Sequence, residues 1–264
     1  MKPQDLNADL TLVDTPLTSH SSKATPRHAA RWRTLVALAC TGLLVACGGG
    51  SDGVGGSAAF GAGAGAGAGG GPGSHQATVS MGTALASVPA SPLSADEEAG
   101  LIFMREEEKL ARDVYAALHA RWGLNTFDNI AASEQSHMDA LLMLLERYAL
   151  PDPAASTAAG VFGNPVLQGL YGALEAAGQT SLVAALQVGA QIEELDIRDL
   201  RAVKATVDNA DLTLVYENLE MGSRNHLRAF HTNLQRQGAS YTPVHITQAE
   251  YDAIVNSPRE TGMP

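Results

Sequence analysis

The sequence predicts an all-α protein whose folded part is a bundle of four long helices with short extra helices. The second half of the chain is rich in Ala and Leu, and the whole sequence is 45% hydrophobic but only 5% aromatic, which favours a core of small aliphatic side chains. Four segments repeat apolar residues at alternating steps of three and four, the period of an amphipathic helix. Each of these rows also carries an acidic residue or a histidine near its middle.

Residues 1–46 are predicted to be a signal peptide that ends in a lipobox. A positive flank precedes residues 34–46, an apolar run that is too short to span a bilayer. The ending Leu44-Val45-Ala46-Cys47 resembles a bacterial lipobox, in which the cysteine becomes the lipidated first residue. We therefore predict lipidation of Cys47, a membrane partner through this anchor, and a place in the cell envelope, on the outer membrane or its periplasmic face. An ordinary signal peptide with a chance cysteine is the alternative.

Residues 47–93 are predicted to be a disordered tether, because residues 48–74 hold 14 of the 27 glycines and cannot bury enough apolar surface to fold. The formal net charge of the chain is −11, and no basic cluster accompanies aromatic residues. This composition excludes nucleic acid as a partner. A second copy of the chain, in a homodimer, is a possible partner.

The helical domain is predicted to span residues 94–253. Its first helix begins at Ser94, which forms a capping-box pattern with Glu97, and ends at Gly123. The inward row of this helix is Leu101, Met104, Glu108, Ala111, Tyr115, Leu118 and Trp122. The second helix covers about residues 127–148 and should pack antiparallel to the first. Its row places Glu134 and His137, three residues apart, on one otherwise apolar face.

The third helix follows a long connection, residues 149–180, with a short helix at about 166–177. A connection of this length can cross the bundle, so the third helix can run parallel to the second. This helix runs from Thr180 or Ser181 to about Val207, and its inward row contains Glu193 and Asp196.

The fourth helix follows a turn at Asp208-Asn209 and places His226 in its inward row, with Ser223 one turn earlier. A second capping-box pattern, from Thr247 to Glu250, predicts a short helix in a tail that covers one end of the bundle. Residues 254–264 are predicted to be a flexible end.

The four inward rows together bring six metal-seeking side chains toward one place. Several acids in one core would repel one another unless cations neutralise them. Carboxylate and imidazole groups suit iron or manganese, and zinc is also compatible. A Glu from each of two helices and Glu-x-x-His from each of the other two is the ligand set of ferritin-like di-iron bundles. The candidate metal ligands are Glu108, Glu134, His137, Glu193, Asp196 and His226.

Four segments carry a closer resemblance. EEKLARDVY (residues 107–115), SEQSHM (133–138), IEELDI (192–197) and GSRNHL (222–227) together resemble a bacterial and archaeal ferritin-like domain family of unknown function, number 2202, within the wider ferritin-like and rubrerythrin-like superfamily. The resemblance covers roughly residues 95–253. It implies a ferritin-like four-helix bundle with a long crossover between helices two and three, and a metal site, but no established reaction.

One position departs from the ferritin-like pattern, because Ser223 stands where a Glu is expected. We expect Asp196 to replace that ligand. In this hypothesis Glu134 and Glu193 bridge two metal ions, Glu108 with His137 completes one side, and Asp196 with His226 completes the other. The alternative is a weak second position, which leaves one metal ion.

Each motif alone has a plainer interpretation. A single Glu-x-x-His is usually structural or solvent-facing, a single core histidine such as His226 is usually hydrogen-bonded without metal, and Tyr115 is either a packed core residue or a neighbour of a ligand with a redox role. The charged residues beside the motifs are expected to be solvated or paired on the surface. These residues are Glu106, Glu107, Arg112 and Glu194.

The leading functional hypothesis is an exported, lipid-anchored protein with a di-iron centre that oxidises Fe(II) with dioxygen or peroxide, a ferroxidase or peroxidase type of oxidoreductase. A second class is a non-redox helical interaction module that is stabilised by a structural metal or by internal ion pairs. Metal-assisted hydrolysis is the weakest of the three, because no substrate-pocket motif accompanies the ligands.

Overall fold

The structure, a computed structural model, describes residues 81–262, and every regular element in this part of the chain is a helix. The predicted all-α class is therefore confirmed. Residues 81–87 are helical. The helices that follow are α3 (Ala95–Trp122), α4 (Asn125–Arg147), α5 (Pro165–Gly178), α6 (Leu182–Lys204), α7 (Ala210–Arg236) and α8 (Gln248–Val255).

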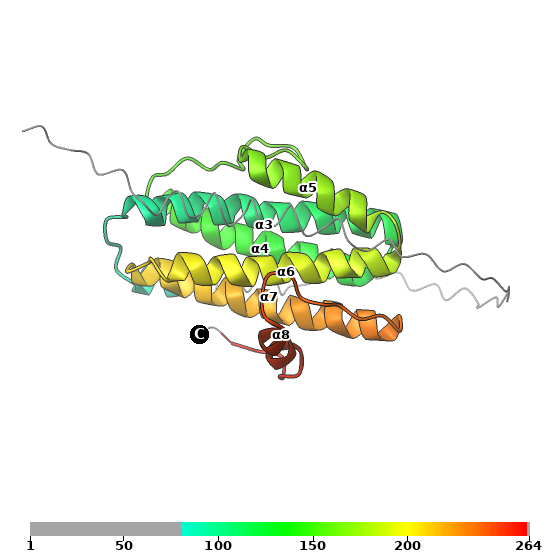
Figure 1. Ribbon diagram of the computed structural model, residues 1–264. Coiled ribbons are helices and arrows are strands. Elements are labelled where there is room, and N and C mark those ends of the chain that lie inside the picture. The colour runs from blue at the N-terminus through cyan, green and yellow to red at the C-terminus, as the bar shows by residue number, and fades with distance from the viewer. Residues whose placement is uncertain (1–80, 263–264) are drawn as a thin grey trace, which may run out of the picture.

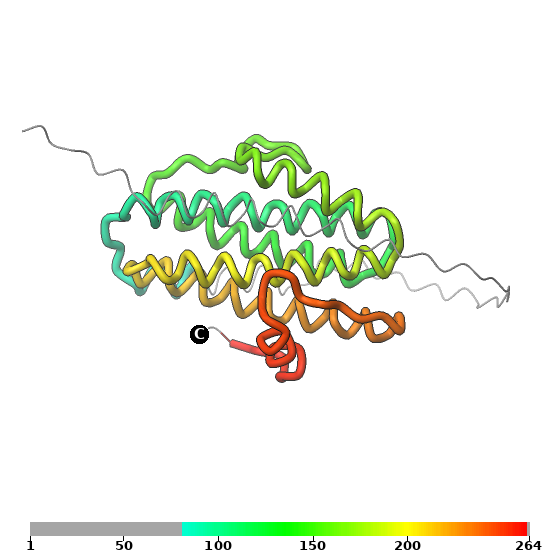
Figure 2. Tube along the Cα trace, in the orientation of Figure 1, coloured from blue at the N-terminus to red at the C-terminus, as the bar shows by residue number. Residues whose placement is uncertain are grey.

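The four long helices, α3, α4, α6 and α7, lie side by side along one direction, and we call them the bundle (Figure 1). α3 packs on α4, α6 packs on α7, and the two pairs meet through α3 with α6 and α4 with α7. The chain trace shows α4 and α6 running in the same direction, as the long connection allows (Figure 2). α5 packs on α3 and α6, and α8 packs on α7.

Local sequence signals set the helix ends. Ser94 forms the predicted capping box at the start of α3, Ser181 caps α6 through its side chain, and Thr247 forms the second predicted capping box, at α8. Gly123 ends α3 with φ at 65°, a left-handed conformation that costs glycine little. Within residues 81–262, no helix is long and apolar enough to cross a bilayer.

The core has two apolar clusters with a polar layer between them. One cluster includes Phe127 and Phe230, and the other includes Leu141 and Leu219. Along α7, for example, His226 lies between Leu219 of one cluster and Phe230 of the other. The predicted ligand residues occupy this layer, so the bundle buries charge in the middle of its length.

The ordered domain begins earlier than predicted. Residues 81–93 were assigned to the tether, but Met81 and Leu85 are buried. Arg147 at the end of α4 donates hydrogen bonds to the backbone oxygens of Leu85 (2.7 Å) and Val88 (2.5 Å). Met81 and Leu85 are four residues apart, so both face the core from one side of a helix. The high glycine content that predicted a tether ends before this segment. The predicted signal peptide, Cys47 and the tether up to residue 80 lie outside the described residues.

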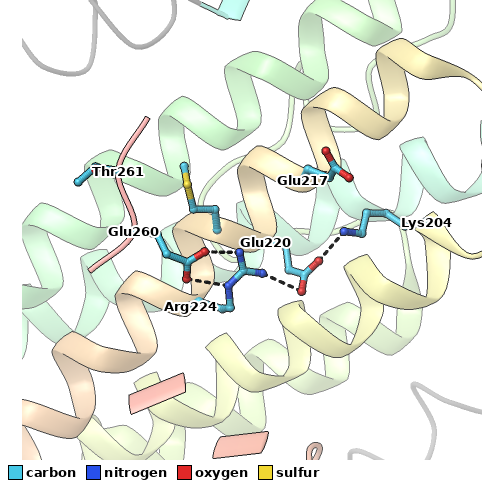
Figure 3. Close-up of a pocket in the computed structure, with 7 residues that line it drawn as sticks. Lys204, Glu217, Glu220, Arg224, Glu260 and Thr261 are labelled. Atoms are coloured by element: carbon cyan, nitrogen blue, oxygen red, sulfur yellow. Dashed lines mark hydrogen bonds and ion pairs between the residues drawn. The ribbon is translucent and has the colours of Figure 1, made fainter. Parts of the chain in front are cut away.

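The end of the chain is also held more firmly than predicted. Ile254 is buried, and Glu260 accepts hydrogen bonds from Arg224 and Arg228 of α7. Figure 3 shows Arg224 between Glu220 and Glu260. These residues border a pocket of about 480 Å³. The prediction of a flexible end is therefore wrong for residues 254–262, because ion pairs that no local pattern reveals attach them to α7.

The close approach of α6 and α7 gives a stability prediction. A Cβ atom at Gly189 would overlap the ring of Phe230, so Gly189→Ala should lower the free energy of unfolding by about 1–3 kcal/mol. Gly172 of α5 is the matched control, because a Cβ there meets no atom within 4 Å. Gly172→Ala should raise the free energy by about 0.5–1 kcal/mol through helix propensity. Urea unfolding followed by circular dichroism measures both, and equal effects would contradict the packing described.

Candidate metal centre

The six predicted ligand residues converge in the polar layer. α3 contributes Glu108, α4 contributes Glu134 and His137, α6 contributes Glu193 and Asp196, and α7 contributes His226. All six are buried: the carboxylates are 1–5% exposed and the two histidines are 7% and 8% exposed. The helical phases inferred from the sequence are therefore correct for this layer.

The first group of ligand atoms joins α3 and α4, and we call it the His137 half. His137 Nδ1 lies 2.8 Å from Glu134 Oε2 and 3.2 Å from Glu108 Oε2. The three residues offer one ligand atom each within 4.8 Å of one another. This spacing suits three ligands of a single ion.

The second group joins α4, α6 and α7, and we call it the His226 half. His226 Nδ1 lies 2.9 Å from Glu134 Oε1 and 3.3 Å from Glu193 Oε2. Glu134, Glu193 and His226 also offer one ligand atom each within 4.8 Å of one another. Glu134 belongs to both halves and turns one oxygen to each, which is the arrangement of a carboxylate that bridges two ions.

Several ligand atoms in the layer are buried and have no hydrogen-bond partner. They include Glu108 Oε1, Glu134 Oε1, Asp196 Oδ1 and His226 Nδ1. Glu134 Oε1 and His226 Nδ1 are only 2.9 Å apart, yet their directions do not make a hydrogen bond. Buried polar atoms are rarely left unpaired in proteins. Buried ligand atoms that converge without hydrogen bonds fit a cation held between them, so the residues present suit a di-metal centre.

Asp196 has a hydrogen-bond partner of its own on α7. It belongs to neither three-residue group, and the hydroxyl of Ser223 donates a hydrogen bond to Asp196 Oδ2. Ser223 lies one turn before His226 on α7. The expected pairing of Asp196 with His226 at a metal ion stays a prediction, and Asp196 Oδ1 is buried without a hydrogen-bond partner.

Two outer hydrogen bonds hold ligands of the His226 half. The Tyr115 hydroxyl donates to Glu193 Oε1 at 2.5 Å, and Ser133 Oγ lies 2.9 Å from His226 Nε2. Tyr115 is also a core residue, so it packs in the core and neighbours a predicted ligand. Ser133 was not singled out from the sequence. Ser133 precedes Glu134 by one residue, so it points only partly toward the inward face of α4. Its partner, His226, lies on α7, far away in the sequence.

Burial and the imidazoles set the charges of the layer. Burial raises the pKa of Glu108 to about 8 and that of Glu193 to about 7, although a neighbouring histidine opposes each shift. For Glu134, burial is outweighed by the charges of His226 and His137, and its pKa lies well below the usual range. Burial would lower the pKa of His226, but Glu134 and Glu193 raise it to about 10. Without metal, Glu134 is thus an anion between two imidazolium groups.

A further acid lies beside the layer. Both carboxylate oxygens of Glu107 are buried without a hydrogen-bond partner. Burial, together with the negative charges of Asp199 and Asp196, raises the pKa of Glu107 well above its usual range. Asp199 continues the three-residue spacing of Glu193 and Asp196, and this signal was available in the sequence.

The charged residues expected at the surface are mostly buried instead. Glu106 accepts hydrogen bonds from the backbone N–H groups of Gly163 and Asn164 in the connection before α5. Glu194 accepts from the Tyr241 hydroxyl and from the backbone N–H of Val244 in the tail. Segments that are distant in sequence therefore cover the outer faces of α3 and α6 at Glu106 and Glu194, and Glu107 is buried beside the acids of α6. The surface prediction is wrong for these three residues.

Arg112 fits the surface prediction better. It is partly exposed, and its guanidinium pairs with Asp113 and donates to Gln135 of α4. Its neighbour Asp113 is buried and also binds Lys109, a fully buried lysine. The pairing expected for Arg112 is therefore present at the boundary between the surface and the packed face of α3.

Comparison with known proteins assigns the bundle to a family. Residues 97–258 match the family model described as "Uncharacterized protein domain (DUF2202)". The chain belongs to this family. The resemblance drawn from the four sequence segments is thus confirmed at the level of the DUF2202 family.

A relative in the archaea extends the comparison. Uncharacterized protein MJ0754 of Methanocaldococcus jannaschii is 52% identical to this chain over 179 residues, which covers 68% of this chain and 97% of the relative. The crystal structure of hypothetical protein MJ0754 from Methanococcus jannaschii DSM 2661 matches the structure with a TM-score of 0.65 over 66% of this chain and 99% of that chain. The similarity therefore spans nearly the whole of that protein.

The charge state of the layer gives a prediction for metal binding. Metal ligands must be neutral imidazoles and ionised carboxylates. The pKa of His226 is about 10 and that of Glu108 about 8. Burial would lower the pKa of His137, but the charges of Glu108 and Glu134 raise it well above its usual range. His226, Glu108 and His137 therefore carry a proton at pH 7 before metal binds. Binding should release on the order of three protons, and affinity should rise from pH 6 to pH 8. Calorimetry in two buffers of different ionisation enthalpy measures the release, and identical heats in both would contradict it.

Proposed function

We propose that this DUF2202 domain is a ferritin-like domain that holds a di-metal carboxylate centre. The observation that supports the proposal most directly is the position of Glu134, which turns one oxygen toward each imidazole and belongs to both groups of ligand atoms. Glu108 and His137 would hold one ion, and Glu193 and His226 the other. The free Oδ1 of Asp196 is available as a further ligand.

Iron is the metal that we favour, with manganese and zinc as alternatives. Carboxylate oxygens outnumber imidazole nitrogens in the layer, and such mixed oxygen and nitrogen sets suit iron and manganese. When bound, iron would supply the redox chemistry, with Fe(II) as the substrate to be oxidised and dioxygen or peroxide as the oxidant. The protein would bind the ions, release the protons of the ligand groups and keep bulk water out of the buried layer.

A second function is favoured by a specific observation. In the structure the two histidines pair with Glu108, Glu134 and Glu193, and this set of ion pairs already places a positive group beside each of these carboxylates. Such pairs can hold a bundle together without any redox role. The alternative is thus a helical interaction module that is stabilised by its internal ion pairs or by a structural metal such as zinc.

Iron oxidation separates the two proposals. The full chain, stripped of metal, should take up Fe(II) without oxygen and should consume oxygen when it is admitted. Glu134→Gln should abolish oxidation, because it removes the charge shared by both halves while it keeps the side-chain volume. Absorbance and an oxygen electrode follow the reaction.

Glu146→Ala is the matched control, since Glu146 is an exposed glutamate on the same helix, α4. It should leave oxidation unchanged. Metal uptake without oxygen consumption in the unmodified protein would support the interaction module, and no uptake of Fe(II), Mn(II) or Zn(II) would contradict the metal centre.

We also propose that the chain is lipid-anchored in the cell envelope through Cys47. In a bacterial host that expresses the full chain, radiolabelled palmitate should enter the protein, and Cys47→Ser should prevent the labelling because the acyl acceptor is lost. Cys40→Ser is the matched control and should still be labelled. Labelling that persists in Cys47→Ser would show that the signal segment has been read wrongly.

A further inference from the structure

The two halves of the proposed centre receive different support from the surrounding protein. His226 turns Nδ1 toward Glu134 and Glu193, while its other ring nitrogen, Nε2, lies 2.9 Å from Ser133 Oγ. A neutral imidazole that offers Nδ1 to a metal carries its proton on Nε2. Ser133 can accept that proton in a hydrogen bond, which helps to hold the ring in the orientation for binding.

Glu193 of the His226 half is held in a similar way. The Tyr115 hydroxyl donates to Glu193 Oε1 at 2.5 Å, while Glu193 Oε2 faces His226. One oxygen is therefore occupied by a protein donor and the other is directed into the centre. Two of the three ligands of the His226 half are thus positioned by hydrogen bonds from outside the centre.

The His137 half lacks such support. A Cβ atom at Gly222 would lie 2.5 Å from His137 Nε2, so this nitrogen rests against the backbone of α7. Among residues 81–262, the hydrogen bond of the His137 ring is to Glu108 through Nδ1, and none reaches Nε2. Glu108 Oε1 is buried without a partner. Within the described part of the chain, the unshared ligands of this half therefore receive no hydrogen bond from outside the centre.

Asp196 does not give the His137 half the outer hydrogen bonds that the His226 half has. Ser223 holds its Oδ2, and Asp196 lies outside both groups of ligand atoms. Among the described residues, it makes no hydrogen bond that would fix the orientation of His137 or Glu108. Outer hydrogen bonds of the kind that Ser133 and Tyr115 make typically change metal affinity by about 10–100-fold.

We propose that the two metal positions are unequal: the His226 half binds a divalent cation first and retains it, because Ser133 and Tyr115 hold its ligands in place, and the His137 half takes a second, exchangeable cation. This inference rests on the proposed di-metal function. It assigns Ser133 and Tyr115 as positioning residues, and it assigns the exchange of metal to the side of the centre that contains His137.

The test is a titration of the metal-free full chain with Co(II), a probe whose visible absorbance reports each ligand set. Two resolved binding steps are expected. His137→Gln should remove the weaker step and keep the tighter one. Ser133→Ala and Tyr115→Phe should each weaken the tighter step by about 10–100-fold, because each removes one outer hydrogen bond and leaves all ligands in place.

Matched controls separate positioning from general damage to the fold. Ser136→Ala removes a hydroxyl on the same helix that bonds only to the backbone of Ala132, and Tyr148→Phe removes a tyrosine hydroxyl that bonds to Asp211, far from the centre. Both should titrate like the unmodified protein. Ser133→Thr keeps a hydroxyl and should restore the tighter step.

Failure of this inference and failure of the proposed function look different. If the folded unmodified protein binds no Co(II), the di-metal function is overturned. If two ions bind with equal affinity, or if Ser133→Ala weakens the step that His137→Gln removes, the di-metal function stands and the inequality is overturned. An unchanged titration of Ser133→Ala would also overturn the positioning role.

Discussion

The arrangement of the bundle depends on one buried carboxylate, that of Glu134, and on the two imidazoles that face it. A carboxylate removed from water costs several kcal/mol unless positive charge or a metal compensates it. His137 comes from the next turn of the same helix, and His226 comes from α7, so the compensation requires α4 and α7 to meet at this depth. Gly222 permits that approach, because a side chain there would strike the His137 ring.

Helical periodicity predicted the polar layer because the inward face of a helix is a local property. The spacing of Glu134 and His137 placed both in the core, and the same phase on α3, α6 and α7 brought the other ligands to meet them. The contacts of Asp196 could not be predicted in this way, because Ser223 on another helix competes for it. Periodicity also cannot reveal which outer face a distant segment covers, and for this reason Glu106 and Glu194 were misplaced at the surface.

The charged residues 105–109 of α3 project from two faces of the helix. Glu108 points into the polar layer, while its neighbours bind the connection between α4 and α5. Lys109, fully buried, donates to the backbone oxygens of Ala158 and Val161, and Glu106 accepts from the backbone of Gly163. Unpaired buried charges are costly, so each of these contacts fixes the connection as well as the helix. The connection between α4 and α5 is therefore tied to the same turn of α3 that carries Glu108.

The attachment of residues 81–87 has a consequence for how the proposed lipid anchor would orient the domain. This short helix is fastened by Arg147 at the C-terminal end of α4, whereas the polar layer sits between the two apolar clusters of the core. The described part of the chain thus begins at the end of the bundle where α4 ends. If Cys47 carries a lipid as proposed, the anchored segment would join the domain at that end, and the polar layer would lie about half a bundle length away from the point of attachment.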